Sequence, residues 1–404
     1  MAQTRVYELR LFDKVVLTFS VGCGFDGDFV DELNLASDGA PLPPGMQATP
    51  DGVWKWLSTR ALPFNRRYAD TLCIMMGIRP GDVERILAVG LGLSLNDSYW
   101  VCPVGFERRF AEVNLFENGF SDVLAAVAYT GHLDLGSSPL SGLTPELTTG
   151  GSLQKAWRIG PDGHRLLYKG STPGWEPGEW ASECLASQVA QRFAASSVRY
   201  WHDAWDDKDC SVCPSFCTRD VSYAPAALSS GSSSFAANLA FAQAAGTEAL
   251  EAFADTWVFD ALVCNTDRHL TNLGYLYDAP TSHLLGPAPI FDNGRALFPN
   301  VADDQLVDAA MLAELARPAC GGESFAQAAS RVIGERQLAT LADMCDFEFN
   351  LEELPHSLHN RAKALEPFLR FRAEELSHFE PVDRINLAQA CAAWRERNGA
   401  TSVR

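Results

Sequence analysis

The order of the expected secondary-structure elements between residues 150 and 380 constrains the fold more than any other feature of the chain. Short strand-like runs surround one long helical segment up to residue 228, and after SSGSSS at 229–234 the sequence becomes mainly helical. In EWASECLASQVAQRFA the apolar residues Trp180, Leu185, Val189 and Phe193 recur at helical spacing. A strand-rich part followed by a helical part predicts an α+β fold with two lobes.

A polar loop is expected at the start of the helical part. Residues 265–272 read NTDRHLTN, and IFDNG follows about twenty residues later. Such a loop can direct the carboxylate of Asp267 at a hydroxyl while the amide oxygen of Asn272 faces a cation. Asp292, after strand-like APIF, is a natural second metal ligand, and YLYD and APIF are expected to form the hairpin that carries it. This combination is what phosphoryl transfer needs, although Asx turns alone explain many Asp/Asn clusters.

Cationic and backbone groups suited to phosphates precede this loop. The runs SLQKAWRI and LLYKGS are separated by Pro-Asp-Gly, which predicts a hairpin with Lys169 in its second strand. Glu183 on the following helix can hold that ammonium group, and Glu179, one helical turn earlier, is the alternative. TTGGSLQK at 148–155 is suited to a loop that closes over phosphates, although its glycines can also simply permit a turn. The candidate nucleotide-binding residues are Gly150, Gly151, Ser152, Lys155 and Lys169.

These motifs, in this order, resemble the protein-kinase-like fold, and most closely the HipA-like serine/threonine kinases of bacteria. The resemblance covers residues 145–380, and its most specific part is VFDALVCNTDRHLTN with PIFDNG. LLYKGS followed by SECLASQVA is similar to the lysine strand and glutamate helix of that family. The chain departs from the family in GGSLQKA, where Gln154 and Lys155 are adjacent, and in the Asn-Gly that follows Asp292.

The resemblance implies a role for each matching residue, and it implies ATP and Mg²⁺ as cofactors. Asp267 would be the catalytic base, with Arg268 and His269 bracing its loop. Members of the family can phosphorylate a hydroxyl of their own phosphate loop, for which this chain offers three candidates. The implied metal ligands are Asn272 and Asp292; the implied phosphate lysine and its partner are Lys169 and Glu183; and the candidate hydroxyls are those of Thr148, Thr149 and Ser152.

Two other functions remain open from the sequence. The D-R-H-x-x-N spacing also resembles phosphoinositide 3-/4-kinases, so a lipid or small-molecule hydroxyl is an alternative acceptor. A pseudokinase that binds nucleotide and interacts through residues 1–140 is the other alternative. The favoured hypothesis is a kinase that phosphorylates Ser or Thr of a protein substrate, with a further protein partner on the N-terminal region.

Charge narrows the range of partners. The chain has 51 acidic residues against 32 Lys and Arg, which gives a formal net charge of −19. Because phosphate contacts need clustered cations, we expect neither nucleic acid nor an anionic membrane as a direct partner. The N-terminus lacks a basic segment followed by an apolar core, so no signal peptide is expected and a cytoplasmic location is predicted.

Length and composition predict several domains. At 404 residues, 47% of them apolar, the chain is expected to form a mainly helical accessory domain (1–140), a kinase N-lobe (141–228) and a kinase C-lobe (229–404). Residues 134–150 are rich in Ser, Thr, Gly and Pro and are expected to form a linker. The eleven cysteines lack regular spacing. Cys210, Cys213 and Cys217, near His202, are therefore interpreted as buried thiols, with a zinc site as the less favoured alternative.

Overall fold

The computed structural model describes residues 5–24, 27–37, 39–79, 81–132, 142–193, 196–322 and 324–398. The chain divides into two compact units. Unit 1 comprises Met1–Lys169, Pro214–Ala224 and Tyr277–His283, and unit 2 comprises Gly170–Cys213, Pro225–Leu276 and Leu284–Arg404. The division into an accessory domain and two lobes at residues 140 and 228 stays a prediction.

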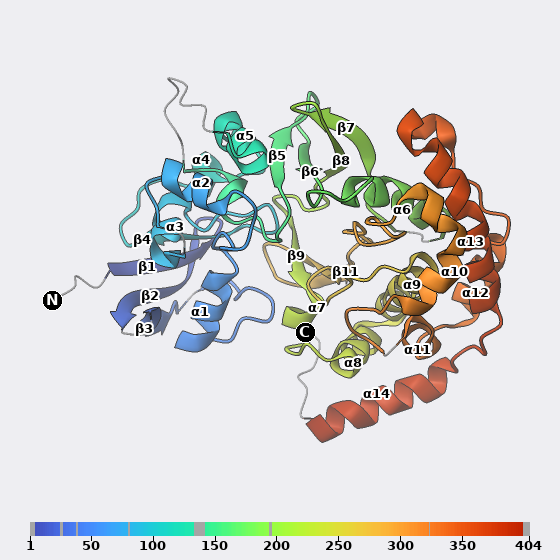
Figure 1. The fold of residues 1–404 in the computed structure, drawn as a ribbon. Coiled ribbons are helices and arrows are strands. Elements are labelled where there is room, and N and C mark those ends of the chain that lie inside the picture. Colours follow the sequence, from blue (N-terminus) through green and yellow to red (C-terminus); the bar gives the residue numbers. More distant parts are fainter. Residues whose placement is uncertain are drawn as a thin grey trace. The chain divides into compact units, whose positions relative to one another are not determined.

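The helices and strands follow one another as Figure 1 labels them. The strands are β1 (Arg5–Leu11), β2 (Lys14–Gly24), β3 (Gly27–Leu35), β4 (Tyr99–Pro103), β5 (Lys155–Ile159), β6 (Arg165–Lys169), β7 (Trp201–Trp205), β8 (Lys208–Pro214), β9 (Val221–Pro225), β10 (Gly274–Asp278) and β11 (Leu284–Pro287). The α-helices are α1 (Pro50–Ser58), α2 (Ala69–Met75), α3 (Val83–Gly90), α4 (Phe110–Val113), α5 (Asp122–Thr130), α6 (Glu179–Phe193), α7 (Ala226–Ser229), α8 (Phe235–Ala245), α9 (Thr247–Val263), α10 (Ala309–Leu315), α11 (Phe325–Ser330), α12 (Glu335–Asp343), α13 (His359–Ser377) and α14 (Arg384–Asn398). Short 3₁₀ helices are η1 (Pro145–Leu147), η2 (Asp303–Asp308), η3 (Leu351–Glu353) and η4 (His356–Leu358).

Unit 1 contains a four-stranded antiparallel sheet in the order β3-β2-β1-β4. Tyr7, Leu9 and Leu11 of β1 are all buried, because alternate residues of a strand face the same side. Leu9 pairs with Leu17 of β2 and with Val101 of β4 at the centre of this sheet. The buried side chains of these strands pack with those of α1 into one core.

The N-terminal region holds more strand than the sequence analysis predicted. Residues 1–140 were expected to be mainly helical, but they combine helices with the sheet of β1, β2, β3 and β4. The reason lies in β2, where Val16, Leu17, Phe19, Ser20 and Val21 are all buried. A strand that is buried on both faces loses the alternating pattern by which a strand is recognised.

The hairpin predicted from Pro-Asp-Gly is confirmed. β5 pairs with β6 in antiparallel register, with Lys155 opposite Lys169 and Ile159 opposite Arg165. Gly163 in the connecting turn has φ +84°, a conformation that glycine adopts without strain.

Only part of the predicted linker lies in the described residues, since 134–141 fall outside them. The remaining part is not a loose connection: it contains η1, whose Glu146 and Leu147 are fully buried. Composition suggested a linker because Ser, Thr, Gly and Pro are also the residues that build a tight, capped turn. Thr144 shows this, since its hydroxyl accepts a hydrogen bond from the Glu146 amide.

Unit 2 is built around α9, the long helix that leads into the polar loop. Every residue from Phe253 to Val263 is buried, the polar Asp255, Thr256 and Asp260 included, which is typical of a helix surrounded by other elements. α6 and α13 contribute to the same core, as the sequence predicted for Leu185 and Val189. The fully buried members from these three helices include Leu185, Val189, Val258, Phe259, Leu262, Leu365 and Leu369.

Three further details of the fold bear on the sequence hypotheses. The second strand of the hairpin near the site is β11, not APIF, and Ile290 of APIF forms only an isolated bridge with Ser197. Cys210, Cys213 and Cys217 are buried, reduced thiols, as the favoured interpretation proposed. Among the helices in the described part of the chain, none has the length and apolarity to cross a bilayer.

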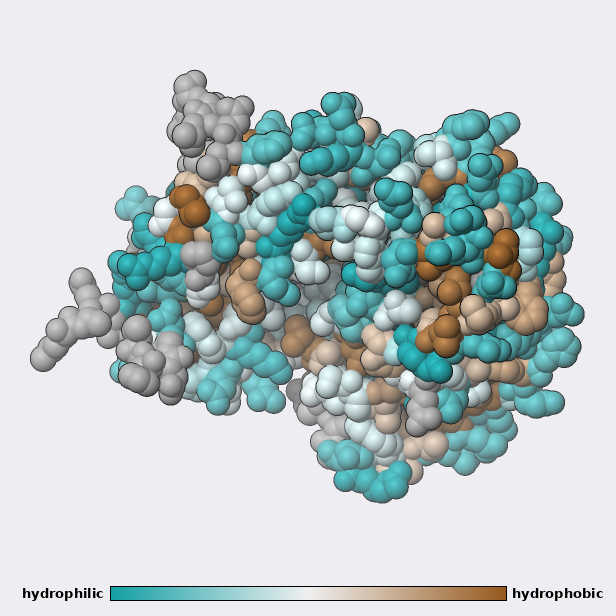
Figure 2. Space-filling view, in the orientation of Figure 1, coloured by the Kyte–Doolittle hydropathy of each residue, from teal (hydrophilic) through white to brown (hydrophobic). Residues whose placement is uncertain are grey.

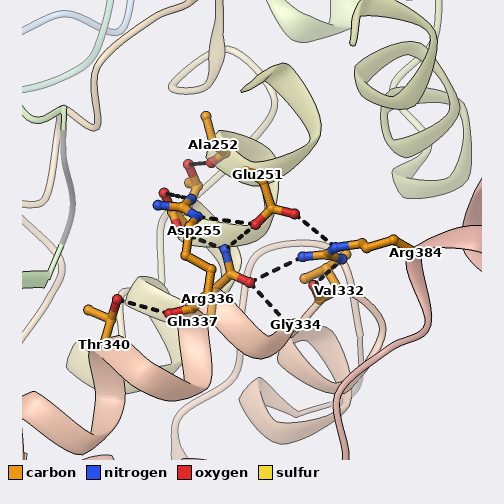
Figure 3. Close-up of polar contacts among 10 residues, drawn as sticks. Glu251, Ala252, Asp255, Val332, Gly334, Arg336, Gln337, Thr340 and Arg384 are labelled. Atoms are coloured by element: carbon orange, nitrogen blue, oxygen red, sulfur yellow. Dashed lines mark hydrogen bonds and ion pairs between the residues drawn. The ribbon is translucent and has the colours of Figure 1, made fainter. Parts of the chain in front are cut away.

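A polar network joins α9, α12 and the start of α14 (Figure 3). Arg384 donates to a Glu251 carboxylate oxygen at 2.8 Å, to the Val332 carbonyl at 2.7 Å and to the Gln337 amide oxygen at 3.1 Å. Burial by itself would raise the pKa of Glu251, but the hydrogen bond from Gln337 and the charge of Arg384 hold it below its usual value. The ionised carboxylate is therefore the form that the fold stabilises.

We expect Arg384→Met to lower the free energy of unfolding by about 1–2 kcal/mol, because the Val332 carbonyl and Glu251 lose a donor that water replaces only in part. Since the pKa of Glu251 is lowered in the folded chain, this stabilisation is present above the carboxyl's usual pKa and declines as the pH falls through the lowered value. Urea unfolding at neutral and acidic pH measures both effects. Arg397→Met, an exposed change on the same helix, is the control. A difference between wild type and Arg384→Met that does not narrow in acid would contradict this account.

Candidate active site

The polar loop begins where α9 ends. Cys264 has φ +53°, so the chain leaves the helix in the left-handed conformation that terminates many helices. Asn265 then accepts a hydrogen bond from the Asp267 amide at 3.2 Å through its side-chain oxygen. Asp267 itself is exposed, and its carbonyl accepts a hydrogen bond from the His269 amide. The backbone of the loop is thus fixed by its own polar groups, while the carboxylate of Asp267 faces solvent.

Arg268 is fully buried and organises the site. Its guanidinium donates to the Asn272 carbonyl at 2.8 Å, to the Phe291 carbonyl at 2.6 Å and to the Asn293 side-chain oxygen at 2.6 Å. One side chain therefore brings the end of the polar loop next to the segment around Asp292. Asn272 and the residue before Asp292 are thus joined through Arg268, while their role as metal ligands stays a prediction.

Asp260 on α9 neutralises the charge of Arg268. Its two carboxylate oxygens accept hydrogen bonds from the guanidinium at 2.9 and 3.2 Å. The side chains of Arg268 and Asp260 are both buried. Burial raises the pKa of Asp260, and the charge of Arg268 offsets part of this rise. Burial would likewise lower the pKa of Arg268, but Asp260 outweighs it and the pKa is raised. The pair is ionised, and each charge depends on the other.

Asp292 has a backbone conformation that is rare outside glycine, with φ +57°. Strained conformations of this kind persist where the surrounding structure enforces them, and they are concentrated at functional sites. Here the Asp292 amide donates to the hydroxyl of Tyr200 at 3.1 Å. Burial raises the pKa of Tyr200 well above its usual value, so the phenol stays protonated and remains an acceptor for that amide.

Glu183 contacts the residue that follows Asp292. Its carboxylate accepts a hydrogen bond from the Asn293 amide at 2.8 Å, so Asn293 joins α6 to Arg268. Glu179, the alternative to Glu183, has other partners: it accepts from the amide and hydroxyl of Thr172 at 2.8 and 2.6 Å, and Arg295 lies 3.4 Å away.

His269 orients the side chain of Asn272. The Asn272 side-chain nitrogen lies 3.4 Å from His269 Nε2, and the Thr271 hydroxyl lies 2.5 Å from His269 Nδ1. The imidazole ring therefore lies between the side chains of Thr271 and Asn272. The Asn272 Oδ1 is thereby turned away from the imidazole ring.

The oxygen donors fit a magnesium ion that arrives with a nucleotide. Asn272 Oδ1 and the Asp292 carboxylate are hard ligands of the kind that Mg²⁺ prefers. In the described part of the chain no three His, Cys, Asp or Glu side chains group to hold a metal ion by themselves. Mg²⁺ commonly takes one or two protein oxygens and completes its shell with water and phosphate. The site suits that mode better than a permanently bound metal.

The glycine-containing loop of unit 1 is held by a buried ion pair. Arg66 donates to the Glu146 carboxylate at 2.7 Å, to the Lys155 carbonyl at 2.5 Å and to the Thr149 carbonyl at 3.3 Å. Glu146 accepts in addition from the Trp157 amide at 2.7 Å. Both ends of the loop are therefore attached to one guanidinium, and between them the Ser152 carbonyl accepts a hydrogen bond from the Arg67 amide at 2.9 Å.

Between these ends the loop offers hydrogen-bond donors. Gly151 has φ +86°, a conformation that glycine adopts without strain, and Lys155 Nζ lies close to it. The amides of Gly150, Gly151 and Ser152 donate to no acceptor within the described residues. Exposed amides next to an ammonium group are suited to an anion such as a phosphate.

The three candidate hydroxyls of this loop differ in accessibility. Thr148 is buried and donates to the Leu93 carbonyl at 2.7 Å. The Thr149 hydroxyl donates to the Pro145 carbonyl at 2.7 Å and accepts from the Trp157 indole at 3.0 Å. Ser152 is exposed. The two threonine hydroxyls have structural partners, and the serine is accessible.

The predicted site residues belong to both units. Glu183, Asp267, Asn272 and Asp292 lie in unit 2, whereas the glycine-containing loop, Lys155 and Lys169 lie in unit 1, where both lysines are buried. The pairing of Lys169 with Glu183 therefore stays a prediction.

Several residues that shape the site were missed by the sequence analysis. Asp260 had a signal, since an acid within the apolar run VFDALV must have a buried partner. Tyr200, Asn293, Arg66 and Glu146 had none, because their partners lie far away in sequence: Arg66 and Glu146 are separated by eighty positions.

Comparisons with known proteins show which fold the chain has. No family model and no curated protein matches the chain. HipA of Shewanella oneidensis MR-1, solved with HipB and its operator DNA, is 15% identical with a TM-score of 0.54, and the match covers 95% of this chain and 99% of that chain. The Helicobacter pylori proinflammatory kinase CtkA is 16% identical with a TM-score of 0.47, covering 61% of this chain and 93% of that chain. The likeness to HipA reaches beyond residues 145–380 into the N-terminal region. The chain thus has the α+β, HipA-like kinase fold that its motifs predicted.

Proposed function

We propose that this protein is an ATP- and Mg²⁺-dependent kinase that phosphorylates a Ser or Thr hydroxyl of a protein. The observation that carries the proposal is the convergence on Arg268 of the polar loop, the Asp292 segment and, through Asn293, Glu183. The four residues that accept hydrogen bonds from Arg268 offset the cost of burying its charge, and the same bonds fix the polar loop next to the Asp292 segment.

In this proposal each residue has one task. Asp267 accepts the proton of the acceptor hydroxyl while that oxygen bonds to the γ-phosphorus and the bond to the departing ADP oxygen breaks. Asn272 and Asp292 would hold a Mg²⁺ ion, which would offset charge on the phosphates. His269 orients the amide of Asn272, and Arg268 fixes the loop.

The unit 1 residues would bind the nucleotide. The exposed amides at 150–152 and the ammonium groups of Lys155 and Lys169 supply donors and positive charge for phosphates, and Glu183 would orient Lys169. The partner of residues 1–140 is proposed to be a protein. A cytoplasmic location stays a prediction.

Incubation of the full chain with Mg·ATP, followed by intact-mass analysis and peptide mapping, tests this function. We expect a gain of one phosphate on Ser152, because Thr148 and Thr149 are engaged in the fold. Ser152→Ala should abolish this gain, whereas Ser330→Ala, an exposed serine of α11, should not.

The same experiment separates the alternatives. ATP binding with no phosphate on the chain, on lysate proteins or on added lipid would point to the pseudokinase. Label on lipid or a small molecule alone would point to the phosphoinositide-kinase-like alternative. Phosphate on Thr148 would contradict the accessibility argument but not the kinase activity.

A further inference from the structure

The segment that follows Asp292 leaves the site and returns to it. Its first part is held by Arg361, which donates to the carbonyls of Leu297 and Phe298 at 2.9 and 2.6 Å and to Asp303 at 2.9 Å. Its far end returns to the polar loop, where the Cys320 thiol donates to the Arg268 carbonyl at 3.3 Å. The segment between them is therefore anchored at both ends next to the residues proposed for catalysis.

The middle of this segment, η2 and α10, has apolar side chains on its buried side and also on its solvent-facing side. Leu306 is buried in the core of unit 2, and Leu312 is partly buried against the same core. The outward side is apolar as well: Val307, Met311 and Leu315 are 83%, 54% and 69% exposed. Their spacing of four residues places them along one side of the helical segment. Figure 2 shows hydrophobic side chains gathered around α10 with hydrophilic ones beside them.

Carboxylates border this apolar row. Asp304, Asp308 and Glu314 are all exposed, and the nearby Arg317 donates to the carbonyls of Glu314 and Ala316. We call Val307, Met311 and Leu315, together with these three acids, the α10 surface. Contiguous exposed apolar side chains with a charged rim are typical of protein interaction sites.

The negative charge of the α10 surface favours one kind of binding partner. A second copy of the chain would bring the same acids and a net charge of −19, and an anionic membrane would also be repelled. A segment with apolar side chains at helical spacing and flanking Lys or Arg complements both the apolar row and its rim.

We propose that the α10 surface docks a basic, amphipathic segment of the protein substrate. This inference rests on the proposed kinase function, which makes the bound protein a substrate. The chain that carries the α10 surface continues to the Cys320 contact with the Arg268 carbonyl, so docking there would raise the local concentration of an acceptor hydroxyl. The docking itself does not depend on catalysis, so it can be measured separately.

The test uses a fluorescent synthetic peptide with leucines at spacings of three and four and lysines on its flanks, titrated with the full chain. We expect saturable binding that weakens with salt, because the rim charges are exposed. Val307→Ser/Met311→Ser/Leu315→Ser should weaken binding by about tenfold or more, as expected for the central apolar contacts of an interface. Asp304→Asn/Asp308→Asn/Glu314→Gln should weaken it and remove most of its salt dependence.

The controls isolate the surface. Phe64→Ser/Ile74→Ser removes two exposed apolar side chains of unit 1 and should bind the peptide as wild type does. Asp267→Asn should also bind it normally, so a failed kinase proposal leaves the docking result readable. Adding a serine-bearing tail to the peptide should raise its phosphorylation rate in wild type over that of the tail alone, and the α10-surface triple variant should lose only this gain.

Four results would overturn the docking proposal. The first two are that the apolar triple variant binds the peptide as tightly as wild type does, and that wild type binds a peptide with Glu in place of every Lys as tightly as the original. The other two are that the chain self-associates, or binds vesicles, in a way that the apolar triple variant abolishes.

Discussion

Asp267→Asn is expected to reduce phosphoryl transfer by about 10²–10⁴-fold, the range that a positioned general base contributes. The substitution keeps the size of the side chain and removes its ability to accept a proton. The loop should keep its shape, because the hydrogen bonds that Asp267 makes to Asn265 and His269 use its backbone. Transfer of labelled phosphate to the chain or to a peptide, together with the affinity for a non-hydrolysable ATP analogue, measures the two consequences.

Asp343→Asn provides the matched control, because this aspartate is exposed at the end of α12, away from the polar loop. It should leave transfer unchanged. If Asp267→Asn turned over ATP at the wild-type rate, Asp267 would not be the base. If ATP affinity fell as strongly as transfer, the substitution would be acting on nucleotide binding instead.

Arg268→Met is expected to lower the free energy of unfolding by about 3–5 kcal/mol, because it leaves the buried Asp260 carboxylate without its compensating charge. The carbonyls of Asn272 and Phe291 lose their donor as well. Activity should be lost even in molecules that remain folded, since Arg268 is the side chain that donates both to the end of the polar loop and to the Asp292 segment. Urea unfolding followed by circular dichroism measures the stability.

The double variant Asp260→Leu/Arg268→Met shows whether the cost arises from an unpaired charge. It should be destabilised by less than the sum of the two single changes, because it removes both charges together. Arg192→Met, which breaks an exposed ion pair with Asp346, should cost no more than about 0.5 kcal/mol. Additive losses in the double variant would mean that the hydrogen bonds to the backbone, and not the charge, dominate.

The sequence by itself determined the elements whose signals are local. The hairpin of β5 and β6 was predicted because Gly163 supplies the positive φ that its turn needs, and α6 because its apolar residues recur at helical spacing. The fold class followed from the order of these elements. The candidate residues of the polar loop were found for the same reason, since Asp267 and Asn272 lie within one short segment.

Only the tertiary structure decided what depends on partners distant in sequence. β2 escaped prediction because burial on both faces erases its alternation, and residues 142–150 were taken for a linker because the buried Arg66–Glu146 pair joins segments eighty positions apart. The same holds inside the site, where Arg268 collects groups from three segments and Asn293 links it to Glu183. A pattern in the sequence reports the preferences of neighbouring residues. The free energy of burying a charge or an unpaired amide depends on which groups the completed fold brings within hydrogen-bonding distance.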